Sequence, residues 1–311
     1  MVTPQAVEHW SQIPAVPAAA FKELELTSLA PAERAAVFHS SGTTEQKPSR
    51  HFHSAASLAV YEASLWRWFE SEALGAGRAA SDLAILTPPP SRVPHSSLAH
   101  MFETVRKKLG QAESAFTGTI SIDGSWAVDF AATMQQLENA GEAGRPVAML
   151  GTAFSFVHLL DHLVENNLHC RLPESSSVME TGGYKNRSRV LPKLELHALI
   201  TERLGVPSEN IVCEYGMSEL SSQAYDTPHS APGTARRFRF PPWARVQIIS
   251  PETGGDVAEG ETGLIRVCDL ANVFSVAAIQ TEDLGVRRGD GFELVGRAQL
   301  AEPRGCSLMN A

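Results

Sequence analysis

A run of hydroxyl-bearing residues near the start of the chain carries the most readily interpreted chemistry. Ser40 and Ser41 precede Gly42, Thr43 and Thr44, so one short loop offers several hydroxyl donors and open backbone N–H groups. Proteins use such donors to hold phosphate oxygens. The run therefore predicts a polyphosphate-binding loop, and the alternative is an ordinary turn, which has a similar composition.

Two further polar segments follow directly on predicted strands. The first contains Gly182 and Gly183, and a double glycine lets the backbone approach a flat ligand closely. The second contains Tyr215, Ser218 and Glu219, which could stack on a base, bond phosphate and hold Mg²⁺, respectively. Both would lie beyond the carboxyl ends of strands, where ligands of open α/β sheets gather. The alternatives are a simple turn and a polar loop with a buried tyrosine.

A carboxylate and a guanidinium near the C-terminal end complete the set. Asp283 could accept hydrogen bonds from both hydroxyls of a ribose, and Arg297 would add a planar donor. Asp283 could instead be a turn residue before Gly285.

Composition limits the classes of protein to which the chain can belong. It has 311 residues, of which 43% are hydrophobic and 20% charged, as in ordinary globular proteins. The formal net charge of −9 argues against a nucleic-acid partner, which normally requires a basic face. We see no apolar run long enough for a membrane span and no secretory signal. The four cysteines are widely spaced with no Cys-x-x-Cys pair, so we expect reduced thiols and a cytoplasmic protein.

The segments around these motifs alternate strand and helix. Short apolar runs predict strands and longer apolar or amphipathic stretches predict helices, one capped by Ser54 and another ended by Gly205. This alternation is typical of a parallel sheet covered by helices. The predicted strands are 83–86, 146–150, 176–179 and 211–213, and the predicted helices are 54–69, 155–164 and 192–204.

The pattern changes near residue 236, where short β-like segments separated by glycine-bearing turns begin. They are 245–249, 263–267, 273–279 and 292–295. We therefore predict an α/β protein with largely parallel sheets and flanking helices, joined to a small β-rich C-terminal subdomain. The expected divisions are an N-terminal lead-in over 1–36, an α/β core over 37–235 and the β-rich part over 236–311. We expect the basic run 236–239 to be a solvated boundary loop.

In order and residue type, these segments resemble the motifs of the adenylate-forming enzymes, the superfamily of acyl-CoA synthetases and adenylation domains. Its phosphate, aromatic and ribose motifs read Ser-Gly-Thr-Thr-Gly, Tyr-Gly-x-Thr-Glu and Thr-Gly-Asp. The matching residues here are Ser41-Gly42-Thr43-Thr44-Glu45, Tyr215-Gly216-Met217-Ser218-Glu219 and Thr281-Glu282-Asp283. The stretches 180–185 and 304–308 are similar to one branch, the acyl-protein synthetases of LuxE type. The resemblance spans about residues 36–308.

This resemblance implies that the chain binds ATP and Mg²⁺ and activates a carboxylic acid, with a fatty acid favoured, as an acyl-adenylate. The acyl group would then pass to a thiol, and a reductase or an acyl carrier is an implied partner. The implied ATP-binding residues are Ser40, Ser41, Gly42, Thr43 and Thr44 at the β,γ-phosphates, Gly182, Gly183, Tyr215 and Gly216 in the adenine-side motifs, Ser218 at the α-phosphate, and Asp283 and Arg297 at the ribose. Glu219 would bind the metal.

The chain departs from its larger relatives at the C-terminal end. Those relatives carry a mobile C-terminal domain with a catalytic lysine, whereas here the last lysine is Lys193 and the chain ends at Ala311. We therefore expect no such domain, and another cation would have to neutralise the α-phosphate. Lys185, which follows the double glycine, is preferred, although a solvated surface lysine is the alternative. The other candidates are Lys47, Arg187 and Arg304.

Cys306 is the candidate acyl carrier. Acyl-protein synthetases pass the acyl group to their own C-terminal cysteine, and a thiolate at this position would be a competent nucleophile. The alternatives are an incidental cysteine, an enzyme whose acceptor is coenzyme A or a carrier protein, and a degenerate nucleotide-binding scaffold without activity. Glutamates at positions 45 and 282, where the pattern has glycine, favour the scaffold because negative charge repels polyphosphate.

Two pairs of histidines need separate interpretations. His158 and His162 lie one helical turn apart, a spacing that can hold zinc, but packed or exposed histidines are the favoured reading. His51 and His53 follow the phosphate loop, and we expect only one of them to face it.

Overall fold

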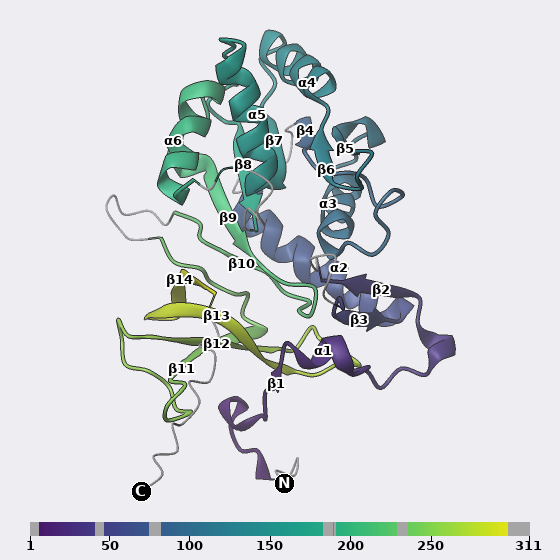
Figure 1. Cartoon of the computed structure of the whole chain (residues 1–311), viewed down its shortest axis with the longest axis vertical. Coiled ribbons are helices and arrows are strands. Elements are labelled where there is room, and N and C mark those ends of the chain that lie inside the picture. The colour runs from purple at the N-terminus through teal and green to yellow at the C-terminus, as the bar shows by residue number, and fades with distance from the viewer. Residues whose placement is uncertain are drawn as a thin grey trace, which may run out of the picture.

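Parallel strands form the centre of the larger part of the molecule, as the alternation of strand and helix predicts (Figure 1). The computed structural model describes residues 6–40, 47–74, 82–182, 189, 191–228 and 236–297. The strands of the first sheet are β4 (Asp82–Ile85), β7 (Val147–Thr152), β8 (Ser177–Thr181), β9 (Ile211–Tyr215) and β10 (Ala224–Tyr225). Their order is β10-β9-β8-β7-β4, with β4, β7, β8 and β9 parallel and β10 antiparallel.

Helices cover both faces of this sheet (Figure 1). One apolar core packs against α4 (Phe130–Glu142), α5 (Ala153–Glu165) and α6 (Lys193–Leu204), and another packs against α2 (Ala55–Phe69) and α3 (Ser97–Lys108). Every residue of β7, β8 and β9 is buried, because these strands are covered on both sides. The predicted helix limits are confirmed, since the Ser54 side chain caps α2 and Gly205, with φ 73°, ends α6.

The second sheet forms the β-rich part of the molecule. Its strands are β1 (Val16–Pro17), β11 (Ala244–Ile249), β12 (Thr262–Asp269), β13 (Ala278–Arg288) and β14 (Gly291–Arg297). The order is β1-β13-β12-β11, and β14 also pairs with β13. All these pairs are antiparallel except the parallel pair of β1 with β13. Residues near the N-terminus thus extend a sheet built otherwise from the C-terminal region, and Phe21 of α1 (Ala20–Glu23) is fully buried in its core.

Two small hairpins and several short helical turns complete the described elements. The hairpins join β2 (Ala36–His39) to β3 (Arg50–His53) and β5 (Gly118–Ile120) to β6 (Trp126–Val128). The short turns are η2 (Trp10–Gln12), η3 (Pro31–Glu33), η4 (Glu70–Leu74), η5 (Glu113–Ala115) and η6 (Ser208–Asn210). None of the helices within the described ranges has the length and hydrophobicity that a bilayer crossing requires.

Two expectations about the β-rich part need correction. The strand predicted at 273–279 is instead β13, which begins at Ala278 and continues through the polar stretch 281–283. Polar residues are accommodated there because Thr281 and Asp283 form specific hydrogen bonds. The basic run is not a solvated loop either, because Phe238 is buried and the guanidinium of Arg236 donates to the carbonyl of Ile211 at 2.7 Å.

Candidate functional site

The two ends of the hydroxyl-rich loop are held together at the base of a β-hairpin. Residues 41–46 lie outside the described part of the chain, whereas Ser40 after β2 and Ser49 before β3 are described. The Ser49 N–H donates to Oγ of Ser40 at 2.9 Å, and the Ser40 N–H donates to the Ser49 carbonyl at 3.3 Å. The residues that flank positions 41–46 therefore lie together at the base of the β2–β3 hairpin, held there by the pairing of the two strands.

Ser218 joins this hairpin to the loop that follows β9. Its carbonyl oxygen lies 2.9 Å from Nδ1 of His51, and its hydroxyl lies 3.5 Å from that of Ser49. The Ser218 hydroxyl donates to Oε2 of Glu219 at 3.0 Å, so Ser49 is the donor in the serine pair. The side-chain amide of Asn272 donates to the Glu219 carbonyl at 2.9 Å. Three stretches that are far apart in sequence thus meet around Ser218 and Glu219.

Tyr215 connects the same loop to the C-terminal sheet. Its hydroxyl donates to Oδ2 of Asp283 at 2.9 Å, and its buried ring packs edge-on against Phe240 and Phe292. Nε of the exposed Arg297 lies 4.0 Å from Oδ1 of the same carboxylate. Burial raises the pKa of Asp283, while the bond from Tyr215 and the charge of Arg297 act in the opposite direction. The aromatic and ribose-motif residues therefore share one contact.

The buried carboxyl group of Glu214 lies under the loop that follows β9, on the face of the first sheet that α2 covers. This loop, residues 216–219, is called the aromatic loop below. The Thr181 hydroxyl donates to the carboxyl of Glu214. Burial raises the pKa of Glu214 to about 7, an effect that the Thr181 bond opposes and the nearby Glu180 reinforces. Oε1 of Glu214 lies only 2.2 Å from the position that a β-carbon on Gly216 would occupy. With the carboxyl in this position, the loop passes over it at a residue that has no side chain.

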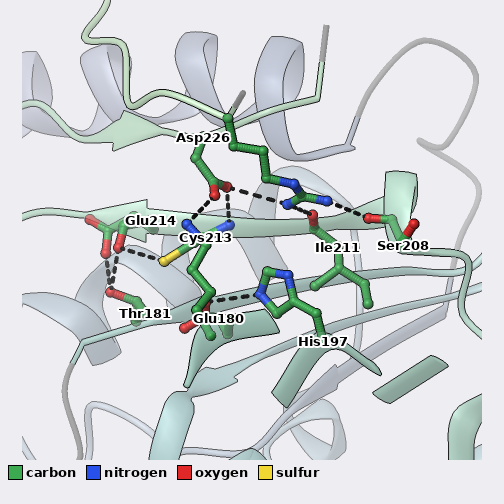
Figure 2. Close-up of polar contacts among 10 residues, drawn as sticks. Glu180, Thr181, His197, Ser208, Ile211, Cys213, Glu214 and Asp226 are labelled. Atoms are coloured by element: carbon green, nitrogen blue, oxygen red, sulfur yellow. Dashed lines mark hydrogen bonds and ion pairs between the residues drawn. The ribbon is translucent and has the colours of Figure 1, made fainter. Parts of the chain in front are cut away.

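The opposite face of the same strands carries a network of charges (Figure 2). Asp226 is fully buried, and its Oδ2 lies 2.5 Å from Nζ of Lys193 at the start of α6. The other oxygen accepts the Cys213 N–H at 2.6 Å and lies 3.7 Å from the Arg236 guanidinium. Burial raises the pKa of Asp226, while Lys193, Arg236 and the Cys213 N–H act in the opposite direction. Beside this network, Nε2 of the buried His197 lies 3.2 Å from Oε1 of Glu180 (Figure 2).

The described cysteines are poor candidates for a nucleophile. Cys170, Cys213 and Cys268 are all buried free thiols. Burial raises the pKa of Cys170 to about 11 and raises those of Cys213 and Cys268 as well. Because the thiolate is the reactive form, none of these three thiols is activated. Cys306 lies outside the described residues.

The predicted site residues fall into two groups. Some lie outside the described ranges, so their surroundings stay unassigned: Ser41, Gly42, Thr43, Thr44, Gly183, Lys185 and Cys306. The others come from the hairpin, the two loops after β8 and β9, and the end of the second sheet: Ser40, Gly182, Tyr215, Gly216, Ser218, Glu219, Asp283 and Arg297. Of these, Tyr215 contacts Asp283 directly, and Ser218 contacts both Glu219 and the residues that flank the hydroxyl loop.

Glu219 is the described carboxylate that could hold a Mg²⁺ ion together with substrate oxygens, and its Oε2 accepts the Ser218 hydroxyl. Mg²⁺ usually takes one or two protein carboxylates and completes its shell with phosphate oxygens and water. Within the described ranges there is no group of three or more His, Cys, Asp or Glu residues arranged to hold a metal ion by themselves. The ring of His158 packs against Phe154, and that of His162 packs against Phe130.

The residues that connect the segments of the site by hydrogen bonds were not predicted from the sequence. The two histidines after the hydroxyl loop were expected to point to different sides, but His51 and His53 are two residues apart in a strand and therefore lie on the same side, with ring centroids 4.3 Å apart. Asn272 and Asp269, which bind the backbone and hydroxyls of the 219–222 loop, were not identified at all. Period-two spacing could have placed the histidines, whereas nothing local distinguishes Asn272 from a turn residue.

Comparison with known proteins places this geometry in context. The family model described as "Acyl-protein synthetase, LuxE" matches residues 2–311. The long-chain-fatty-acid–luciferin-component ligase of Aliivibrio fischeri is 26% identical over 196 residues, a match that covers 59% of this chain and 50% of that protein. The Vibrio harveyi protein of the same name is 23% identical over 191 residues, covering 58% of this chain and 49% of the relative. The matched stretch thus spans about half the length of these relatives.

Solved structures share the fold at low sequence identity. ATP-bound MatB from Rhodopseudomonas palustris has a TM-score of 0.56 and 17% identity, with 86% of this chain and 49% of that chain covered. McyG A-PCP in complex with phenylalanyl-adenylate has a TM-score of 0.58 and 16% identity, with 87% and 42% covered. The mixed α/β architecture predicted from the sequence is therefore confirmed.

Proposed function

Because the chain belongs to the acyl-protein synthetase (LuxE) family, we propose that it activates a carboxylic acid with ATP to form an acyl-adenylate. One observation carries this proposal: three parts of the chain meet around Ser218 and Glu219. They are the β2–β3 hairpin, the loop after β9, and Asn272 between β12 and β13 of the second sheet. The ATP-bound state of MatB and the adenylate bound to McyG support the same chemistry for this fold. The names of the relatives from Aliivibrio fischeri and Vibrio harveyi support a long-chain fatty acid as the substrate.

In this proposal the segments that meet at the site bind different parts of ATP. The hydroxyl segment that begins at Ser40 would hold the β,γ-phosphates, and Ser218 would contact the α-phosphate. Asp283 and Arg297 would bind the ribose hydroxyls beside Tyr215. Mg²⁺ held by Glu219 would neutralise charge on the phosphate oxygens when bound. The residues would therefore act mainly by positioning the carboxylate for in-line attack on the α-phosphate, with release of pyrophosphate.

Lys185 is the proposed cation for the α-phosphate. It lies outside the described residues, three positions after Gly182 in the sequence. The other candidate lysine, Lys47, is half exposed, and its ammonium lies 3.3 Å from the Glu23 carboxylate. That pairing makes Lys47 the weaker candidate.

The acyl group would then pass to a thiol, and we propose the side chain of Cys306. A thiolate sulfur would attack the acyl carbon of the adenylate, forming a thioester while AMP leaves with the bonding electrons. The buried, unactivated state of Cys170, Cys213 and Cys268 favours a thiol outside the described core. The alternatives are coenzyme A and an acyl-carrier protein, and the carrier domain named with McyG supports the latter class of partner.

Pyrophosphate exchange tests the activation step. Wild-type protein with ATP, Mg²⁺ and a series of saturated fatty acids should incorporate labelled pyrophosphate into ATP, with a clear optimum of chain length. Glu219→Gln should reduce exchange by about 100-fold. The variant loses the carboxylate that would bind Mg²⁺, and with it the stabilisation of charge in the transition state. Glu252→Gln, which changes an exposed carboxylate in the turn after β11, should exchange at the wild-type rate. A flat response of the wild type to every acid would instead support a non-catalytic nucleotide-binding scaffold.

Acyl labelling tests the acceptor separately. Incubation with ATP, Mg²⁺ and a radiolabelled fatty acid should leave label on the protein that neutral hydroxylamine removes, as expected of a thioester. Cys306→Ser should abolish this label while pyrophosphate exchange continues. Equal labelling of Cys306→Ser and wild type would rule out Cys306 as carrier, and Cys170→Ser serves as the control for removal of a thiol.

A further inference from the structure

His51 is the buried side chain through which the β2–β3 hairpin contacts the aromatic loop. It lies in β3, two residues after Ser49, and is only 1% exposed. Its Nδ1 lies 2.9 Å from the carbonyl oxygen of Ser218, which is 167 residues away in the sequence. The ring is also in edge contact with Phe21, with centroids 6.0 Å apart. A polar ring in an apolar setting is thus aimed at one backbone atom of the proposed phosphate site.

The protonation state of this ring follows from its surroundings. Burial lowers the pKa of His51 to about 4, although the bond to Ser218 opposes the change, so the ring is neutral at neutral pH. A carbonyl oxygen can only accept a hydrogen bond, so the single ring proton must be on Nδ1. The ring therefore donates a directed hydrogen bond to the Ser218 carbonyl as a neutral group.

His53 provides an internal control for burial. Its ring lies beside that of His51 and is equally buried, at 1% exposure. Within the described ranges neither of its ring nitrogens has a hydrogen-bond partner, and the ring packs against Phe38 and Tyr61. The two histidines of this strand are thus equally buried and both contact aromatic rings, but only His51 bonds to the loop after β9. The bond to Ser218 is therefore separable from the general packing of the hairpin.

We propose that His51 is a positioning residue that sets the distance and orientation between the β2–β3 hairpin, which carries Ser40, and the loop that carries Ser218 and Glu219, before ATP binds. This inference rests on the proposed function, because it assigns the hairpin and the loop to one ATP molecule. In the proposed function, Ser40 of the hairpin and Ser218 of the loop must reach phosphate oxygens at the same time. If the hairpin and the loop are already held in place, less conformational entropy is lost when ATP binds, and the affinity is higher.

Shape-matched variants of the two histidines test this role. His51→Phe keeps the ring and loses the donor, whereas His51→Asn keeps a donor nitrogen close to the position of Nδ1. His53→Phe changes the neighbouring ring without touching the bond. Titration calorimetry with ATP and Mg²⁺ should show a dissociation constant raised about tenfold in His51→Phe, as expected for one lost hydrogen bond. His51→Asn and His53→Phe should stay within about threefold of wild type.

Steady-state pyrophosphate exchange provides the second readout. The KM for ATP should rise in His51→Phe, while the KM for the fatty acid should be unchanged, because only the hairpin and the loop lose their alignment. If His51→Phe does not fold, His51→Gln replaces it, since its amide lies one carbon further along and cannot donate from the same point.

Two results would overturn the inference. One is an equal loss of ATP affinity in His51→Phe and His53→Phe, which would indicate general packing. The other is a loss in His51→Asn as large as that in His51→Phe. Failure of the wild type itself to bind ATP or exchange pyrophosphate would instead refute the proposed function, so the two failures are distinguishable.

Discussion

The two faces of the strand pair β8–β9 bury carboxyl groups in opposite ways. On the α6 face, Asp226 lies 2.5 Å from the ammonium of Lys193 and 3.7 Å from the Arg236 guanidinium (Figure 2). On the α2 face, the carboxyl of Glu214 receives the hydroxyl of Thr181. Both side chains are buried, with Asp226 at 0% and Glu214 at 6% exposure.

This difference shows how the surroundings decide the charge of a buried acid. A carboxylate in an apolar setting needs an opposite charge or several donors, and without them it takes up a proton instead. Cations oppose the effect of burial at Asp226, whereas at Glu214 burial raises the pKa to about 7 with one hydroxyl acting against it. On the first face the buried carboxyl group therefore depends on neighbouring cations, and on the second face it depends on a bound proton.

The largest expected effect comes from removing the cation on the α6 face. Lys193→Met should lower the free energy of unfolding by about 3–5 kcal/mol, because it leaves Asp226 buried beside a more distant guanidinium. Urea unfolding at pH 7 measures the change. Lys108→Met, which changes an exposed lysine of α3, should be nearly neutral, and Asp226→Asn in the Lys193→Met background should recover part of the loss. A loss below 1 kcal/mol in Lys193→Met would contradict the role of the ion pair.

The next largest effect is the pH dependence of stability that the carboxyl group of Glu214 produces. The pKa of Glu214 rises from 4.5 to about 7 on folding, so its stabilising contribution is complete below pH 4.5 and is lost as the pH rises through 7. This difference corresponds to about 3 kcal/mol. Glu214→Gln cannot titrate, so its free energy of unfolding relative to wild type should increase between pH 4.5 and pH 8 by about that amount. Parallel stability curves for the two proteins over this range would show that Glu214 has an ordinary pKa.

The smallest effect is expected at a carboxylate of intermediate exposure. The side chain of Asp283 is 27% exposed, and it accepts the Tyr215 hydroxyl at 2.9 Å. Tyr215→Phe should reduce stability by only about 1 kcal/mol, because water can replace the lost donor. Urea unfolding measures this, with Tyr61→Phe as the matched loss of a hydroxyl that donates to a backbone carbonyl. A loss as large as that in Lys193→Met would place Asp283 with the fully buried acids.

Much of the fold could be predicted because its strands are strongly apolar. Val147–Thr152 and Ile211–Tyr215 are buried along their whole length, so hydrophobicity alone marks them. Helix α4 received no prediction, since Phe130–Glu142 has few buried residues and a polar C-terminal half. The limits of β13 were misplaced because its site-facing residues are polar.

The candidate site was predictable only one segment at a time. Short motifs identified Ser40, Tyr215, Ser218, Glu219 and Asp283 as residues of interest. Their connections depend on the tertiary fold, and no local pattern reports a bond between a strand histidine and a carbonyl 167 residues later, or between a lysine of α6 and Asp226.

The contact between Glu214 and Gly216 has a consequence for how this sequence can evolve. A methyl group at position 216 would meet Oε1 of Glu214 at 2.2 Å, and moving the carboxyl group away would disturb the bond that its other oxygen, Oε2, accepts from Thr181. The order in which mutations occur therefore matters: a shorter residue at 214 opens position 216 to substitution, whereas the reverse order passes through a strained intermediate. The two sites form an epistatic pair, in which the tolerance of one position is set by the history of the other.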